Sequence, residues 1–169
     1  AGLVPVNTNY RYTDDELEYL WTNSDAVAVV FHGTFTSRCA GMRDRVPGIR
    51  TWIWVDDGTE PCPSWAVDYE VAAASANEVG RVSAPWGRSG DDLYILYTGG
   101  TTGMPKGVLW RQHDIFISAM GGRPFGQTEA FPDLASIVEA SKNGGARMMS
   151  VAPLMHGAAQ WATFTAFTG

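Results

Sequence analysis

Cysteine and lysine are both scarce in this chain of 169 residues, which contains two of each. Cys39 and Cys62 are too few for a disulfide framework, and their spacing matches no zinc-ligand pattern. The sequence therefore predicts two thiols in a reducing cytoplasm and no metal ligands in this chain. No apolar run reaches the ~18 residues that a membrane-spanning helix needs, so we expect no transmembrane segment.

Positive charge is also in short supply. Twelve Lys and Arg residues stand against 18 Asp and Glu, and the formal net charge is -6. A nucleic-acid partner would require clustered cations, so we expect no such partner. Hydrophobic residues make up 45% of the chain, enough for the core of one soluble globular domain. The composition leaves a homo-oligomer open.

The start of the chain lacks both a signal peptide and an initiator methionine. Ala1 and Gly2 lead directly into an apolar run of strand length. We therefore expect the chain to be one part of a longer protein.

Apolar runs of strand length alternate with helical patterns, which is typical of βαβ units. The predicted strands are residues 3–7, 26–31, 51–55, 92–96, 108–110 and 147–151. A short first helix is predicted to begin after Thr13. The other predicted helices are residues 36–45, 69–76, 114–120, 134 to the stop at Asn143, and 158–167. This order predicts an α/β fold with a partial doubly wound, mostly parallel sheet flanked by helices. The continuous run 26–31 favours a strand buried on both faces, and the run 158–167 a buried helix.

Several polar clusters have a structural explanation. Thr13 to Glu16 forms a capping-box signature, with Leu17, Leu20 and Trp21 on one helical face. Asp56 and Asp57 precede Gly58 and indicate a turn rather than a metal site. We expect His32 to be an ordinary residue at the end of a strand.

The segment from Tyr97 to Trp110 contains the strongest chemical signal, because it combines glycines with hydrogen-bond donors and carries no acid. Glycines 99, 100, 103 and 107 allow backbone N–H groups to converge on an oxyanion. Three threonine hydroxyls and one ammonium add further donors, namely Thr98, Thr101, Thr102 and Lys106. Pro105 favours an extended backbone at the lysine end. The segment is therefore predicted to be a phosphate loop between two strands, with a solvated hairpin as the structural alternative.

Two common phosphate loops do not fit. The Walker pattern fails because Lys106 lies between Pro105 and Gly107, and the dinucleotide pattern fails on glycine spacing. The ten residues from Thr98 to Gly107 instead resemble the phosphate-binding motif of the acyl-adenylate-forming superfamily, Thr-Ser/Gly-Gly-Ser/Thr-Thr-Gly-x-Pro-Lys-Gly. The segment Trp110 to Phe116 and the residues Pro-Leu-Met-His-Gly look similar to bacterial fatty-acyl or steroid-side-chain CoA synthetases.

A second motif of that superfamily, Pro-x-x-His-x-x-Gly, is matched by Pro153 and His156. The chain departs from it where Gly157 follows the histidine directly and Ala159 occupies the later glycine position. Without this setting, His156 would be interpreted as a satisfied histidine at a helix start.

The resemblance implies a ligase that joins a carboxylic acid to AMP from ATP and passes the acyl group to coenzyme A. It assigns binding of the β- and γ-phosphates, together with Mg²⁺, to Thr98, Gly99, Gly100, Thr101, Thr102, Gly103 and Lys106. It also gives Lys106 and His156 catalytic roles, with His156 and Trp161 lining the pocket of a small-molecule acid. Both reactants are anionic, so such an enzyme must screen charge and align them.

Other segments of that superfamily have no match in residues 1–169: the Tyr-Gly-x-Thr-Glu segment, the ribose-binding aspartate, the hinge and the small C-terminal domain. We therefore expect a fragment of the large N-terminal domain that is inactive alone. Two alternatives remain open, an adenylating domain that loads a carrier-protein thiol and a non-catalytic nucleotide-binding module. An ATPase that releases orthophosphate is disfavoured by the failed Walker pattern.

Overall fold

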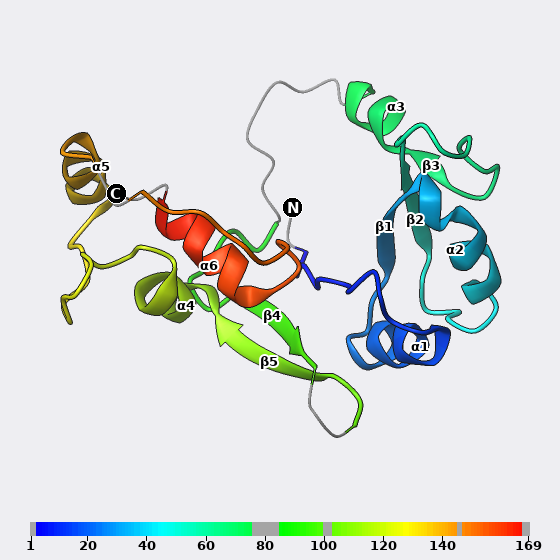
Figure 1. Ribbon diagram of the computed structural model, residues 1–169, viewed down its shortest axis with the longest axis horizontal. Coiled ribbons are helices and arrows are strands. Elements are labelled where there is room, and N and C mark those ends of the chain that lie inside the picture. The colour runs from blue at the N-terminus through cyan, green and yellow to red at the C-terminus, as the bar shows by residue number, and fades with distance from the viewer. Residues whose placement is uncertain (1–2, 76–84, 100–102, 145–146, 167–169) are drawn as a thin grey trace. The chain divides into compact units, whose positions relative to one another are not determined.

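A computed structural model describes residues 3–75, 85–99, 103–144 and 147–166 (Figure 1). The chain divides into two compact units. The sheet unit is Tyr10–Val82, and the hairpin unit combines Ala1–Asn9 with Ser83–Gly169. Each unit is described by itself below.

The sheet unit is built on three parallel strands in the order β1-β2-β3, which Figure 1 shows side by side. Its elements are α1 (Asp14–Asn23), β1 (Ala28–His32), η1 (Gly33–Phe35), α2 (Thr36–Met42), β2 (Thr51–Val55), β3 (Val67–Asp68) and α3 (Tyr69–Ala74). The predicted α/β class, a parallel sheet with flanking helices, is confirmed. The two-residue strand β3 was not predicted, because a run this short has no periodicity to detect.

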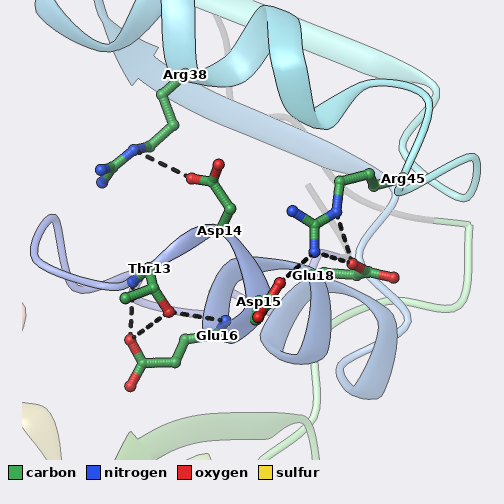
Figure 2. Close-up of polar contacts among 7 residues, drawn as sticks. All are labelled: Thr13, Asp14, Asp15, Glu16, Glu18, Arg38 and Arg45. Carbon is green, nitrogen blue, oxygen red and sulfur yellow. Dashed lines mark hydrogen bonds and ion pairs between the residues drawn. The ribbon is translucent and has the colours of Figure 1, made fainter.

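Helix α1 begins at the predicted capping box (Figure 2). The Glu16 N–H donates to the Thr13 hydroxyl, and the Glu16 carboxylate accepts from the Thr13 N–H at 2.8 Å. Two N–H groups that the helix leaves without partners are thereby satisfied. The three acidic residues of the first turn also complement the positive end of the helix dipole.

Two arginines outside α1 pair with its acids, as Figure 2 shows. Arg45 contacts Asp15 at 2.5 Å and Glu18 at 2.5 Å, and Arg38 in α2 lies 3.5 Å from Asp14. Hydrogen bonds to Asp15 and Glu18 raise the pKa of the Arg45 guanidinium above its ordinary value. These ion pairs tie α1 to α2 and to the turn that follows α2, but exposed pairs of this kind contribute little stability.

The core of the sheet unit is aromatic. The ring of Trp52 in β2 meets two other indoles edge-on. Its centroid lies 5.8 Å from that of Trp21 in α1 and 5.8 Å from that of Trp65. Phe31 of β1 stacks on Trp65 at 5.6 Å. The predicted apolar face of α1 is confirmed, because Leu17, Leu20 and Trp21 are all buried. Among the described residues this cluster joins the helix to one face of the sheet.

The expectation that residues 26–31 form a strand buried on both faces is wrong. In β1 burial alternates, and Val30 is 61% exposed while its neighbours Val29 and Phe31 are buried. A continuous apolar run does not reveal how many layers cover a strand, because that depends on which segments pack against each face.

The predicted strand end at His32 and the predicted turn at Gly58 are both confirmed. His32 is the last residue of β1, and Gly58 has φ +76° in the turn after β2. Asp57 accepts hydrogen bonds from the Thr59 hydroxyl and from the Thr34 N–H, which lower the pKa of its carboxyl.

Both cysteines are free thiols, and burial raises the pKa of Cys39 to about 12. That thiol is therefore unreactive at neutral pH.

The described residues of the hairpin unit form one antiparallel pair of strands and three helices. Its elements are β4 (Leu93–Thr98), β5 (Lys106–Arg111), α4 (Gln112–Ala119), α5 (Leu134–Lys142) and α6 (Gly157–Ala166). Within the described ranges, no helix is both long and apolar enough to cross a bilayer.

Two predicted strands do not form. Residues 3–7 supply a single parallel bridge, from Val6 to Ile95 of β4, in part because Pro5 has no N–H to offer a ladder. Residues 147–151 pair with no described strand, and Met149 and Val151 are 82% and 87% exposed. An apolar run becomes a strand only where a neighbouring strand satisfies its backbone.

Two predicted helices, α5 and α6, form, and few of their residues are buried among the described residues. In α6 the buried described residues are Gly157 and Ala159, while Phe164 is exposed, so the expectation of a buried helix is wrong. In α5 only Ile137 is buried. The start of α6 lies against β4 (Figure 1), whereas most of its remaining surface is only partly covered by the described residues.

Candidate functional site

The predicted phosphate loop connects β4 to β5, and the hairpin sets the geometry of its two ends. Thr98 is paired with Lys106 in the antiparallel register, as the last pair before the connection. Lys106 is therefore the first residue of β5, which confirms the prediction that the lysine end is extended. Thr98 and Lys106 are both exposed, whereas Pro105 is buried. The proline anchors this end of the connection and leaves the neighbouring ammonium accessible.

The glycines next to this pair leave space around the backbone. Gly103 has φ +118°, a conformation that residues with side chains rarely adopt, and no atom of the described residues lies within 4 Å of a Cβ placed on Gly99 or Gly103. Gly100, Thr101 and Thr102, which complete the predicted loop, lie outside the described residues. In the part of the chain that is described, the Lys106 ammonium has no ion-pair partner.

Gly107 has a different role in the same motif. A Cβ at this position would lie 3.0 Å from the ring of Tyr97, the residue paired with it across the hairpin. The Tyr97 ring therefore covers the glycine backbone, an approach that a side chain would obstruct. Gly107 serves hairpin packing, while Gly99 and Gly103 have no close neighbour among the described residues.

The second motif forms a turn followed by a helix. The His156 N–H donates to the Pro153 carbonyl at 2.9 Å, and the His156 carbonyl accepts from the N–H groups of Ala159 and Gln160 as α6 begins. His156 is exposed. The proline and histidine of the motif are thus the two ends of one turn, which explains their fixed spacing.

Gly157, where the chain departs from the family pattern, fits against the strand that leads into the glycine-rich connection. A Cβ on Gly157 would lie 2.4 Å from Leu96 Cδ2, and Leu96 lies two residues before Thr98. The same strand contacts α6 again where the Tyr94 hydroxyl donates to Gln160 Oε1. The fold therefore brings the two motifs together through β4.

Trp161 is half-buried on α6, beside the Tyr94 hydroxyl. Burial raises the pKa of Tyr94, and the nearby Trp161 indole partly opposes this effect. The indole nitrogen is buried and reaches hydrogen-bond geometry with no described residue. Sequence reasoning did not single out Tyr94 and Gln160, and no local motif could have found them, because they are 66 residues apart.

The hairpin unit also contains an open groove of about 1020 Å³. It runs between α4, the loop after α4, α5 and α6, and its wall includes Ile117, Arg123, Phe125, Phe131 and Met148. Neither His156 nor Trp161 lines it. The described residues hold no cluster of three or more His, Cys, Asp or Glu side chains suited to a metal ion.

Comparison with known proteins identifies the protein family to which this chain belongs. Residues 1–169 match the family model described as AMP-binding enzyme. The chain therefore belongs to the AMP-binding enzyme family.

Two relatives illustrate the similarity. The chain is 45% identical over 170 residues to a medium-chain acyl-CoA ligase, Mig, of Mycobacterium avium. The alignment covers 99% of this chain and 30% of that ligase. It is 38% identical over 164 residues to a 3-oxocholest-4-en-26-oate CoA ligase of Rhodococcus rhodochrous, over 95% of this chain and 29% of that protein. The chain thus spans about 30% of the length of these curated relatives.

Solved structures share the fold. A red-emitting luciferase of Phrixothrix hirtus superposes with a TM-score of 0.64 at 17% identity, covering 99% of this chain and 30% of the luciferase. The anthranilate CoA ligase AuaEII, solved with anthranoyl-AMP, superposes with a TM-score of 0.59 at 19% identity over 73% of this chain and 23% of that protein.

Proposed function

We propose that this chain is part of an ATP-dependent acyl-CoA synthetase that activates a carboxylic acid as acyl-AMP and transfers the acyl group to coenzyme A. The observation that carries the proposal is the complete ten-residue motif from Thr98 to Gly107, whose described ends are paired between β4 and β5. The names of the two CoA-ligase relatives support the reaction class.

The described ends of the loop suit a polyphosphate. Thr98 and Lys106 stand opposite one another and are exposed, and no described atom crowds Gly99 or Gly103. We infer that the backbone N–H groups and hydroxyls of Thr98, Gly99, Gly100, Thr101, Thr102 and Gly103 bind the β- and γ-phosphates of ATP, which carry Mg²⁺. ATP supplies the electrophilic phosphorus and the pyrophosphate leaving group. The Lys106 ammonium offsets negative charge that develops on the phosphates.

His156 and Trp161 are proposed to line the acyl pocket. The turn from Pro153 to His156 places the exposed histidine at the start of α6, and Gly157 of α6 lies against Leu96 of β4, two residues before Thr98. His156 would then hold the substrate carboxylate near the phosphate that it attacks. The relatives' names favour a medium- or long-chain fatty acid or a steroid-side-chain acid as the substrate.

We further propose that the chain is a portion of the large adenylate-forming domain and is inactive alone. Pyrophosphate exchange that depends on a carboxylic acid, measured with the 169-residue chain by itself, would contradict this. The cytoplasmic location and a homo-oligomeric state remain predictions.

The two lysines of the chain allow a matched test. In the intact enzyme that carries this chain, Lys106→Ala should lower the rate of acyl-AMP formation about 10²- to 10³-fold, because it removes a preorganised donor to developing charge. Lys142 pairs with Glu139 at the end of α5, and Lys142→Ala should leave the rate unchanged. ATP–pyrophosphate exchange in the presence of a fatty acid measures both. Equal rates for the two variants would show that Lys106 is a solvated residue of a hairpin and takes no part in acyl-AMP formation.

The alternative functions differ in the products that they form and in whether they require free coenzyme A. A carrier-loading domain would form acyl-AMP but would not require free coenzyme A. A non-catalytic nucleotide-binding module would bind ATP and form no acyl-AMP. Release of orthophosphate in place of pyrophosphate would indicate an ATPase.

A further inference from the structure

We propose that Gln160 is a positioning residue, which holds the turn that carries His156 against strand β4. The proposal rests on the function proposed above, because it concerns the orientation of His156 toward the glycine-rich loop. Gln160 lies on α6, four residues after the histidine, and would not contact the reacting atoms.

Both ends of the Gln160 amide are used. Its Nε2 donates to the Leu154 carbonyl at 2.7 Å, and its Oε1 accepts from the Tyr94 hydroxyl. A carbonyl can only accept a hydrogen bond, so the NH₂ group must face Leu154 and the amide oxygen must face Tyr94. One side chain therefore links the turn to the strand.

The Leu154 carbonyl is held from a second side. Asn7 Nδ2 donates to it at 3.3 Å. Leu154 lies inside the turn that the Pro153 carbonyl and the His156 N–H close at 2.9 Å. Two side chains from distant parts of the chain thus meet at one carbonyl within the motif.

Tyr94 is suited to be the fixed end of this link. Burial raises the pKa of its hydroxyl, with Trp161 opposing the shift, so the group stays protonated and donates at neutral pH. Tyr94 lies four residues before Thr98 on the same strand. A displacement of the link would therefore change the distance between the histidine turn and the loop.

A packing contact restricts the same helix. Tyr94 and Leu96 are two residues apart on β4, so both side chains point to the same face of the strand. Gly157 meets Leu96 on that face, and Gln160 meets Tyr94. Steric contact sets how closely α6 approaches β4, and the Gln160 amide sets the position of the turn.

Imidazole NMR on the 169-residue chain tests this directly, because the chain has three histidines. With ¹³C-labelled histidine, Gln160→Ala should shift or broaden the His156 signals and leave those of His113 and His32 in place. Gln127→Ala, at an exposed glutamine of the same unit, should change none of the three. Tyr94→Phe keeps the half-buried ring and removes only the hydroxyl, so it should reproduce the effect of Gln160→Ala. Unchanged His156 signals in both variants would overturn the proposal.

Kinetics of the intact enzyme separate positioning from general destabilisation. Gln160→Ala and Tyr94→Phe should each lower kcat/KM for the carboxylic acid about 10- to 100-fold, because a small misplacement of an aligning group is costly. The KM for ATP should not change. The double variant should lose no more than either single variant, because the two groups form one link. Additive losses, or equal changes in both KM values, would contradict a positioning role.

The two readouts also distinguish this proposal from the function on which it rests. A shifted His156 signal in a protein without carboxylate-dependent activity would refute the synthetase function and retain the link. An active enzyme whose His156 signal does not shift in the variants would support the synthetase function and refute the link.

Discussion

At the scale of single residues, glycines show how the same residue type serves different purposes. Gly103 supplies a left-handed backbone conformation, whereas Gly107 and Gly157 leave room for Tyr97 and Leu96. Sequence alone predicted the glycines of the loop as phosphate-binding residues. It could not show that Gly107 is a packing residue, because the side chain that covers it comes from the opposite strand.

The close approach at Gly157 leads to a stability prediction. Gly157→Ala places a methyl group 2.4 Å from the buried Leu96 side chain, so the protein should lose about 1 to 3 kcal/mol of unfolding free energy. Gly41→Ala in helix α2 is the matched control, because no described atom lies within 4 Å of a Cβ placed there. That variant should gain roughly 0.5 to 1 kcal/mol. Urea denaturation measures both, and effects of the same sign would contradict the packing argument.

At the scale of elements, local hydrogen bonds explain why most boundaries were predictable. Thr13 caps α1 and Asp133 caps α5, and each is bonded to a residue three positions later. Strand β2 spans residues 51–55 as predicted, between a Pro-Gly pair and an Asp-Gly turn. The run 147–151 lacks such a local device and would need a distant partner strand.

The cap of α5 gives a prediction for acid. Asp133 accepts 2.8 Å hydrogen bonds from the N–H and the hydroxyl of Ser136, and these lower the pKa of its carboxyl. The native state therefore binds this proton less readily than the unfolded state does. The contribution of this group should be complete above the ordinary value of 3.8 and decline as pH falls through the lowered native value.

The neutral cap Asp133→Asn isolates this effect. The difference in unfolding free energy between wild type and Asp133→Asn should shrink on acidification and stay constant near neutral pH. In Ser136→Ala, an NMR titration of the Asp133 carboxyl should give a higher pKa than in the wild type. Parallel stability curves for wild type and Asp133→Asn would show that the carboxylate charge contributes nothing.

At the scale of the whole molecule, the chain has two compact units with different kinds of core. The sheet unit is held by aromatic side chains around Trp52, and the hairpin unit by contacts between β4, α4 and α6. Composition predicted enough apolar material for one domain. It could not show the division, because that depends on which apolar residues meet.

A core substitution tests the independence of the units. Leu20 is 0% exposed, so Leu20→Ala should cost the sheet unit about 2 to 5 kcal/mol. The exposed Val71 of α3 supplies the control, and Val71→Ala should change stability by less than about 0.5 kcal/mol. In Leu20→Ala, the His32 imidazole signal should report unfolding at a lower urea concentration than the His113 signal. Simultaneous loss of both signals would show one cooperative unit.

The sequence by itself determined the features that depend on neighbours a few residues apart. These are the helix caps, the turns and the ten-residue motif with its proline-extended lysine end, because their partners are fixed by chain geometry. Tertiary structure alone decided which sheet face is covered, whether residues 147–151 pair, and how the histidine turn is held. Those outcomes depend on residues far apart in the chain, such as Tyr94 and Gln160, whose contact is a property of packing and leaves no periodic signal in the sequence.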